Sequence, residues 1–435
     1  MPQVSDWSRR GFLQGTAIAA APLILPSGLW SKSLKGDGPN SRINLALVGM
    51  GMRLTGIAGS FSNFEDVQIV AVCDCVDARL ENGAQRVEDL YKQRKRSSKG
   101  LRQEKDFRKL YADKSIDAVA IGTPDHWHAI QSIQAARTGK HVYCEKPLTR
   151  TIGEGRAVVN AARKAKIIFQ TGSQQRTEYK GMFRQAVEYV RNGRIGKLKK
   201  IYIGIGGPPR PDNLPNEELP PGINWGMWLG PAPQRGFNHV LCPIGVHKHF
   251  PRWRDYREYA GGPLSDIGAH HFDIAQWAME MDGSGPLQII PPKDPSATQG
   301  LRFRYKSGIE MVHSRKLGGG GCRFVGSKGE ISVSRRRIES SPGKILEQEL
   351  TKSDKRLEEI GKNHQRNWID CIRSGRKPVA DVEIGHRTNT VCMLANIAYQ
   401  LARPLRWDPK KEQFSGDAGA NSLIHQRERS PWTPV

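Results

Sequence analysis

A short apolar segment that runs directly into a glycine pair constrains this chain more than any other feature. Residues 43–48 have the length and composition of a buried strand, and Gly49 and Gly51 follow at once, before a segment with a helical pattern. Such a turn lets a pyrophosphate rest on the helix N-terminus. We therefore predict a doubly wound α/β domain with a parallel sheet. Its dinucleotide turn comprises Gly49, Met50, Gly51, Met52 and Arg53.

The dinucleotide fingerprint is incomplete at its third position. Leu54 stands where glycine or alanine is usual, and Gly56 is a candidate to compensate by letting the helix pack closely. The next apolar segment ends in Asp74, at the spacing of an acid that binds the adenosine ribose and repels a 2′-phosphate. NAD is thus favoured over NADP, although Arg79 lies nearby. The alternative role for Asp74 is to cap the following helix.

Three further apolar segments complete the predicted parallel sheet of a first domain over 42–172. They are 116–121, 141–144 and 167–172, preceded by a basic stretch over 77–112 that we expect to be helical. Ligands of such sheets bind beyond the C-terminal ends of the strands. The expected cofactor contacts there are Thr123, Pro124, His128, Glu145 and Lys146. The proline after Lys146 drives this lysine out of the helical region and makes the bond between them a candidate cis peptide.

The pattern changes after residue 172 to longer alternating strands. These predict a second, α+β domain over 173–410 with an open, mostly antiparallel sheet, followed by an irregular tail over 411–435. The expected strands are 199–204, 301–305, 309–315, 322–325 and 330–333, with helices over 363–374 and 389–402.

A long insertion, 206–260, interrupts this second domain and is rich in proline and aromatic residues. Loops of this length are usually functional. Its aromatic rings suit two interpretations, flat platforms for a sugar or a small core of the loop itself. The rings are those of Trp225, Trp228, Phe237, Trp253, Tyr256 and Tyr259.

The segment 261–273 carries the most concentrated chemistry. Helical spacing places Asp266, His270 and Asp273 on one face, so one helix presents an acid, an imidazole and a second acid together. This is typical of a catalytic arrangement. The alternative is a helix turn with capping acids and a hydrogen-bonded core histidine.

The N-terminal segment is typical of export. An arginine pair, Arg9-Arg10, precedes a short apolar run, which resembles a bacterial twin-arginine signal with a linker up to residue 41; the alternative is a disordered basic terminus. That pathway exports folded proteins, so a cofactor can be loaded in the cytosol and carried to the periplasm. The apolar run is too short for a confident membrane span. The seven cysteines match no zinc or disulfide framework, and we expect no structural disulfides.

The net charge of +24 makes polyanions conceivable partners. The basic residues fall in scattered runs without a nucleic-acid-binding motif, so a solvated basic surface is favoured and we expect no nucleic-acid partner. His126, His128, His247 and His249 do not have the spacing of a metal site, and we expect no metal.

Three elements occur in the order Gly49-x-Gly51, Glu145-Lys146-Pro147 and Asp266-x-Gly268-x-His270-x-x-Asp273. With them, the chain resembles the Gfo/Idh/MocA oxidoreductase family over 42–410, and segments 228–233 and 367–407 resemble an exported branch common in planctomycetes. The resemblance implies a nicotinamide-binding Rossmann domain, an open-sheet substrate domain that often forms a dimer or tetramer, and a reaction centre of Lys146, Asp266 and His270.

The chemistry that follows is hydride transfer between NAD and a sugar, polyol or glycoside. His270 accepts the hydroxyl proton, Asp266 orients the imidazole, and Lys146 stabilises the developing alkoxide. Further substrate contacts are expected from Arg176, Trp253, Tyr256 and Asp273. One alternative is an NAD-dependent glycoside hydrolase, which oxidises C3 transiently with a tightly bound cofactor. Another is a carbohydrate-binding protein without catalytic activity.

Overall fold

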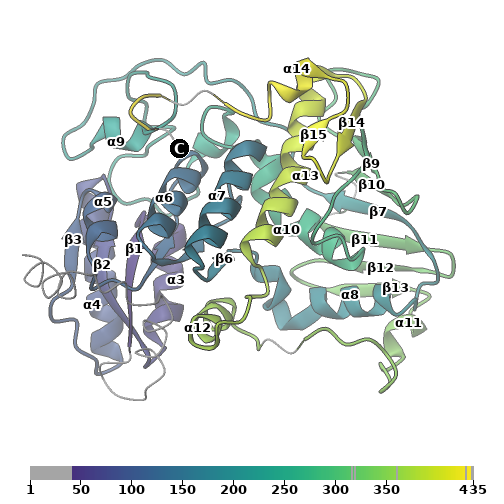
Figure 1. Ribbon diagram of the computed structural model, residues 1–435, viewed down its shortest axis with the longest axis horizontal. Helices are drawn as coiled ribbons and strands as arrows, with labels where there is room; N and C mark the ends of the chain where they lie inside the picture. Colours follow the sequence, from purple (N-terminus) through teal and green to yellow (C-terminus); the bar gives the residue numbers. More distant parts are fainter. Residues whose placement is uncertain (1–41, 315–316, 318–319, 359–360, 427–428, 433–435) are drawn as a thin grey trace, which may run out of the picture. The chain divides into compact units, whose positions relative to one another are not determined.

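Two sheets organise the chain. The computed structural model describes residues 42–314, 317, 320–358, 361–426 and 429–432, and the predicted export signal over 1–41 lies outside the described residues. One sheet has six strands and the other has nine. Their arrangement can be followed in Figure 1. All seven cysteines lie in the described part of the chain and are free thiols. None of the described helices is long and apolar enough to cross a membrane.

The six-stranded sheet is parallel and has the strand order β3-β2-β1-β4-β5-β6. Its strands are β1 (Ile43–Val48), β2 (Val67–Cys73), β3 (Arg102–Glu104), β4 (Ala118–Ile121), β5 (His141–Cys144) and β6 (Phe169–Thr171). The connecting helices are α3 (Met52–Ser62), α4 (Asp77–Gln93), α5 (Phe107–Ala112), α6 (Asp125–Arg137) and α7 (Ile152–Ala165). The order reverses between β1 and β4, so the fold predicted for this domain is confirmed, and a crevice opens at that switch point.

The expectation of one helical stretch over 77–112 is wrong, because β3 interrupts it. The strand pairs with Ala71–Cys73 at the edge of the sheet. Its three residues, Arg-Gln-Glu, are polar, so no apolar run or alternation identifies the strand in the sequence.

The nine-stranded sheet has the order β13-β12-β11-β7-β10-β9-β8-β14-β15. Among the described strand pairs of this second sheet, only β7 and β10 pair in parallel. The predicted, mostly antiparallel sheet is therefore confirmed. Its strands are β7 (Leu198–Gly204), β8 (Gln288–Ile290), β9 (Arg302–Arg304), β10 (Glu310–His313), β11 (Gly321–Gly326), β12 (Glu330–Val333), β13 (Ile338–Ser341), β14 (Leu405–Asp408) and β15 (Gln413–Phe414). The helices α8 (Met182–Arg191) and α10 (Gly262–Ala278) contact it and bury the main core.

The chain after residue 410 is not the irregular tail that we expected. β15 pairs with β14, and the short helix α14 (Ala418–Asn421) follows. The rings of Trp407 and Phe414 are 5.0 Å apart and buried in the core of this domain. Two-residue and four-residue elements are too short to show a period in the sequence, so only their burial reveals them.

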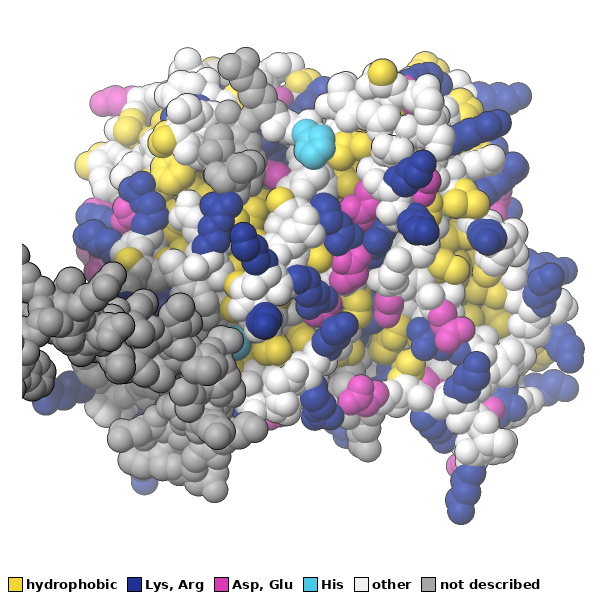
Figure 2. Space-filling view, in the orientation of Figure 1, with side chains coloured by type: hydrophobic (Ala, Val, Ile, Leu, Met, Phe, Trp, Pro, Cys, Tyr) yellow, Lys and Arg dark blue, Asp and Glu magenta, His cyan; other side chains and the backbone are white. Residues whose placement is uncertain are grey.

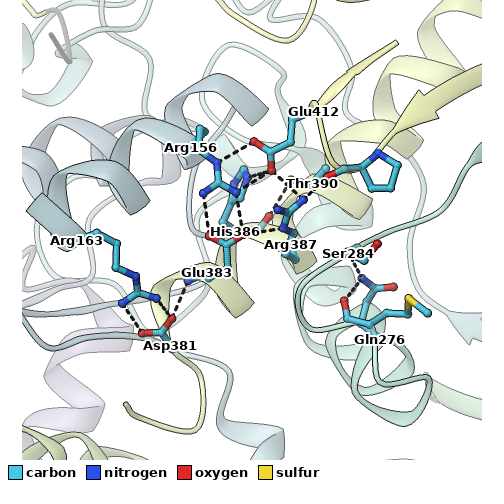
Figure 3. A network of polar contacts seen from close by, with 12 residues as sticks. Arg156, Arg163, Gln276, Ser284, Asp381, Glu383, His386, Arg387, Thr390 and Glu412 are labelled. Atoms are coloured by element: carbon cyan, nitrogen blue, oxygen red, sulfur yellow. Dashed lines mark hydrogen bonds and ion pairs between the residues drawn. The ribbon is translucent and has the colours of Figure 1, made fainter. Parts of the chain in front are cut away.

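The two sheets are joined by a polar network between α7, α13 (Val382–Leu401) and the turn between β14 and β15 (Figure 3). Arg156 on α7 donates paired hydrogen bonds of 2.8 Å to Glu383 and to Glu412. His386 and Arg387 on α13 also contact Glu412, at 2.7 and 3.0 Å. Burial raises the pKa of Glu383, but Arg156 and Arg387 outweigh burial and lower it to about 2. These ionised groups fasten the first domain to the second.

The insertion contains the short helix α9 (Trp225–Leu229) and the 3₁₀ turn η5 (Arg252–Asp255). All six aromatic residues named from the sequence are buried in one cluster, and the rings of Trp225 and Trp228 stack at 4.8 Å. The interpretation as a small core of the loop is therefore confirmed over the sugar platform. Val76 of the first domain completes the cluster, so the insertion is anchored there.

Lysine and arginine side chains are spread over the face shown in Figure 2, with acids interspersed among them. They do not gather into one stripe there. This distribution is typical of a solvated basic surface.

Candidate active site

A cleft opens where β1, β2 and β4 end. Its walls come from three parts of the chain: the glycine turn after β1, the ends of β2 and β4, and the insertion. From the turn and the strand ends come Gly49, Gly51, Met52, Arg53, Asp74, Thr123 and Pro124, and from the insertion come Trp228, Leu241, Phe250, Trp253 and Arg254. The cleft lies at the switch point, where doubly wound folds bind dinucleotides.

The glycine turn has the geometry that a pyrophosphate requires. Gly49 has φ +89°, and a Cβ atom there would lie 2.7 Å from the Thr123 nitrogen, so no other residue fits. Gly51 is the N-cap of α3, which has no side-chain cap, and a Cβ atom at Gly51 would meet nothing within 4 Å. The N-terminus of α3 is therefore open to an anion.

Leu54 is accommodated by a glycine on a neighbouring strand end. A Cβ atom added at Gly122, just after β4, would lie 3.0 Å from the Leu54 Cβ. A Cβ atom added at Gly56 would meet nothing within 4 Å, so the expectation that Gly56 compensates is wrong. In the usual fingerprint the third glycine, on the helix, makes room for the neighbouring strand. Here the glycine is on the strand side, at Gly122, and makes room for Leu54 on the helix.

Asp74 lies buried at the end of β2 and accepts a hydrogen bond from the Val76 amide at 2.9 Å. Burial raises its pKa, while Arg79 opposes the rise. The Arg79 guanidinium itself turns to the insertion, where it donates to the carbonyl groups of Pro243 and Gly245. Asp74 therefore faces the cleft with its nearest arginine already engaged.

Thr123 and Pro124 line the cleft, but His128 does not. The His128 ring is buried, and its nitrogens lie 2.8 Å from the Pro147 carbonyl and 2.9 Å from the Thr123 carbonyl. Burial lowers its pKa, but Cys144 and the two carbonyl groups raise it overall. His128 thus holds the two strand ends together instead of lining the cleft.

Glu145 is a buried carboxylate that connects the glycine turn to the second domain. It pairs with Arg53 at 2.9 Å and accepts a hydrogen bond from Gln174 at 2.8 Å. Gly172 leaves the room for this carboxylate, since a Cβ atom there would lie 2.8 Å from it. Both Arg53 and Glu145 were expected near the cofactor, and the structure pairs them with each other.

Lys146 joins the two domains at the expected reaction centre. Its Nζ donates to the Asp266 carboxylate at 2.6 Å and to the Asp266 carbonyl at 2.8 Å, and the Lys146–Pro147 bond is cis. Burial raises the pKa of Asp266, but Lys146, Arg254 and Arg335 outweigh burial and lower it. The Asp266 carboxylate is therefore ionised and holds the ammonium group in place.

His270 lies one helical turn after Asp266 and is buried. Its Nδ1 has no hydrogen-bond partner among the described residues, so Asp266 does not orient the ring as expected. The carboxylate is instead taken by Lys146. Burial lowers the pKa of His270 well below its ordinary value, and the nearby Lys146 and Arg335 lower it further. His270 is therefore neutral at pH 7.

The other expected substrate contacts separate into two groups. Arg176 and Asp273 pair with each other at 2.8 Å and are almost completely buried, with side-chain exposures of 1% and 0%. Asp273 thus points to Arg176 and not to the centre that Asp266 faces. Tyr256 belongs to the insertion core and stacks with Arg210, while Trp253 lines the cleft.

Two charged residues near this centre were missed from the sequence. Asp125 follows Pro124 directly; burial, with a contribution from Asp266, raises its pKa to about 7. The position of Asp125, shortly after the end of a predicted strand, could have identified it as a site residue from the sequence. Arg254 lies 3.7 Å from the Asp266 carboxylate, and nothing in the sequence around it indicates this contact. Among the described residues, no group of three or more His, Cys, Asp or Glu could hold a metal ion.

This strand order, with an open helix N-terminus at the switch point and a lysine–aspartate pair beside it, defines a Rossmann-type oxidoreductase. Two profiles of the Gfo/Idh/MocA oxidoreductase family match the chain, the NAD-binding Rossmann fold over residues 43–173 and the C-terminal alpha/beta domain over residues 209–434. The chain belongs to this family.

Curated relatives include sugar and polyol enzymes. The chain is 28% identical to a myo-inositol 2-dehydrogenase of Thermotoga maritima, covering 66% of this chain and 74% of that protein. It is 29% identical to a 1,5-anhydro-D-fructose reductase of Ensifer adhaerens, covering 41% and 43%. It is 31% identical to a glycosyl hydrolase family 109 protein of Solibacter usitatus, covering 36% of each. The chain thus matches less than half the length of two of these relatives.

Solved structures show the same fold. The WlbA dehydrogenase from Bordetella pertussis, in complex with NADH and UDP-GlcNAcA, is similar with a TM-score of 0.59 and 18% identity over 84% of this chain and 99% of that chain. The aldose-aldose oxidoreductase from Caulobacter crescentus, complexed with glycerol, is similar with a TM-score of 0.57 and 20% identity over 84% and 99%.

Proposed function

We propose that the protein is an NAD-dependent oxidoreductase that acts on a CH–OH group of a sugar, polyol or glycoside. The observation that carries the proposal is the Lys146–Asp266 pair, at 2.6 Å, near a buried and neutral His270. Arg254, which lines the dinucleotide cleft, contacts the Asp266 carboxylate of this pair. The named activities of the inositol dehydrogenase and anhydrofructose reductase relatives support the substrate class.

The residues divide the chemistry between them. The nicotinamide supplies the hydride acceptor when it is bound, with Gly49, Gly51 and Asp74 holding the dinucleotide. Neutral His270 accepts the hydroxyl proton of the substrate. The Lys146 ammonium donates a hydrogen bond to the developing alkoxide, and Asp266 holds that ammonium in position.

We infer that NAD is preferred over NADP. The Asp74 carboxylate accepts hydrogen bonds from ribose hydroxyls and repels a 2′-phosphate. The nearby Arg79, which could attract that phosphate, is occupied by the carbonyl groups of Pro243 and Gly245.

We also propose that the cofactor stays bound while the protein is exported to the periplasm. The twin-arginine pattern at Arg9-Arg10 supports export, and the insertion residues that wall the cleft support retention. We also propose that copies of the chain form a dimer or tetramer through the open face of the nine-stranded sheet. That face carries alternating charges, among them the Lys200–Glu310 and Arg323–Glu330 pairs, which suit a polar contact between copies.

An NAD-dependent glycoside hydrolase is the second candidate. The match to the family 109 glycosyl hydrolase of Solibacter usitatus favours it, as does a cofactor that must be recycled within the site after export.

One experiment separates the candidates. The purified protein is mixed with matched free sugars and aryl glycosides while NADH absorbance and products are followed together. We expect net NAD reduction with an oxidised sugar product. Release of the aryl group without net NAD change would establish the hydrolase, and the lack of both reactions in protein that contains no dinucleotide would leave a carbohydrate-binding protein.

A further inference from the structure

Arg254 is delivered to the reaction centre by the insertion. Its guanidinium lies over the Trp253 ring at 4.1 Å and over the Phe250 ring at 5.0 Å, and its Nη1 donates to the Pro251 carbonyl at 3.2 Å. The side chain is 19% exposed and lines the cleft. Stacking on aromatic faces fixes the plane of the guanidinium, so that its donors have a set direction.

The charge of Arg254 is not matched by an acid of its own. The nearest carboxylate oxygen, Asp266 Oδ1, lies 3.7 Å from Arg254 Nε, but Lys146 Nζ already binds that oxygen at 2.6 Å. Arg335 also acts on Asp266, and its own Nε donates to the Gln175 side chain at 3.1 Å. Burial raises the pKa of Asp125 to about 7, although Arg254 opposes the rise. The positive charges around Asp266 therefore exceed the negative ones.

The dinucleotide does not account for this excess. Its pyrophosphate belongs at the N-terminus of α3, where Arg53 is the neighbouring cation and already has Glu145 as partner. Arg254 is instead next to the Asp266 carboxylate, which holds Lys146 in place for the reacting hydroxyl in the proposed mechanism. A group on the substrate is the natural partner.

We propose that Arg254 binds a carboxylate of the substrate, so that the enzyme acts on acidic sugars such as hexuronic acids or their glycosides. Arginine is suited to this role because its planar fork binds a carboxylate through two parallel hydrogen bonds. The proposal rests on the proposed function, since it assigns the substrate class of the same site. With a neutral polyol, the nearest carboxylate to Arg254 remains Asp266, which Lys146 already binds at the shorter distance.

The test compares acids with their neutral counterparts. Binding of methyl glucuronide and methyl galacturonide to the NAD-loaded protein is measured by calorimetry, alongside methyl glucoside and methyl galactoside, and kcat/KM is measured for the corresponding free sugars. We expect at least one acid to bind about tenfold or more tightly than its neutral partner. Arg254→Met should abolish this preference by weakening binding of the acids more than binding of their neutral counterparts, and Arg254→Lys should retain part of it.

Arg252→Met is the matched control, because Arg252 lies on the same turn, is 62% exposed and pairs with Asp255. It should keep the preference. The proposal is overturned if every acid binds no better than its neutral partner, or if Arg254→Met weakens NAD binding and leaves the preference intact. A preference for acids that is seen without hydride transfer between NAD and any sugar would support the role of Arg254 and refute the proposed oxidoreductase activity. The failures of the two proposals are therefore distinguishable.

Discussion

The ammonium group of Lys146 is held by two oxygens of Asp266 and is the main electrostatic element of the reaction centre. We expect Lys146→Met to lower kcat by about 10²–10³-fold, the usual effect of removing one donor from a developing oxyanion. Dinucleotide content should stay close to that of the wild type. Rapid-mixing measurements of NADH formation check the expected fall in kcat. Lys109→Met, on an exposed lysine of α5, serves as the control, and a kcat within threefold of wild type for Lys146→Met would contradict the assigned role.

Gly122 and Leu54 form a second residue-scale test, because one makes room for the other. Gly122→Ala should destabilise the protein by about 1–3 kcal/mol, as overpacking does. In the double variant with Leu54→Gly the destabilisation should be smaller than the sum of the two single effects by about 1 kcal/mol or more, since the Leu54 Cβ that the new methyl group meets is then absent. Urea unfolding measures all three. Gly56→Ala has open space and should be neutral or slightly stabilising; additive effects of the first pair would refute the compensation.

The sequence indicated single residues where they belong to a recognisable motif. It did not indicate them where their role depends on a contact with a residue distant in the sequence. Lys146, Asp266 and His270 follow from tripeptide and helical spacing. The pairing of Asp273 with Arg176 does not, because 97 residues separate them and only the fold brings the two together. Arg254 belongs to no sequence motif. The only indication of its position was the neighbouring Trp253, on whose ring it stacks and which was expected to contact the substrate.

At the scale of elements, the insertion acts on the cofactor cleft through Arg79. We expect Arg79→Met to speed NAD release by about tenfold, because the carbonyl groups of Pro243 and Gly245 lose their donor and the segment that walls the cleft loosens. Two measurements check this, the dinucleotide retained after gel filtration and the rate of tryptic cleavage after Lys248.

Arg86→Met is the matched control, since Arg86 is an exposed arginine on the same helix. It should change neither measurement. Faster NAD release with unchanged cleavage at Lys248 would show that Arg79 contacts the cofactor directly and does not tether the insertion.

The elements that were predictable are those that are mostly apolar. β1, β2 and β5 have the bounds that were predicted, because buried parallel strands are rich in apolar residues and each of these contains a single strongly polar one, Asn44, Gln68 or His141. β3 and β15 could not be predicted, since one is polar and the other has two residues. The insertion core lay between two interpretations that composition alone does not separate.

At the scale of the whole molecule, buried histidines set the response to acid. Burial lowers the pKa of His126 and His271 to about 3 and that of His141 and His364 to about 4. The unfolded chain, with an ordinary histidine pKa near 6.5, binds more protons than the folded protein below that pH.

Stability should therefore be complete above about pH 6.5 and fall as the pH drops to 5, with each histidine contributing up to about 1.4 kcal/mol per pH unit. His128 and Asp125, whose pKa values are raised, oppose the trend by a smaller amount. Urea midpoints measured at half-unit steps check the slope. A flat profile from pH 6.5 to 5 would show that these histidines are protonated in the folded state.

The insertion has a consequence for how such enzymes diversify. It packs largely on its own aromatic core and touches the reaction centre through a few side chains, foremost Arg254, whereas Lys146, Asp266 and His270 belong to the shared frame. With the roles proposed for Arg254 and for Lys146, Asp266 and His270, substrate choice and hydride chemistry are encoded in separable stretches of the gene. Under this proposal, replacing the insertion changes the preferred sugar and leaves the catalytic residues in place.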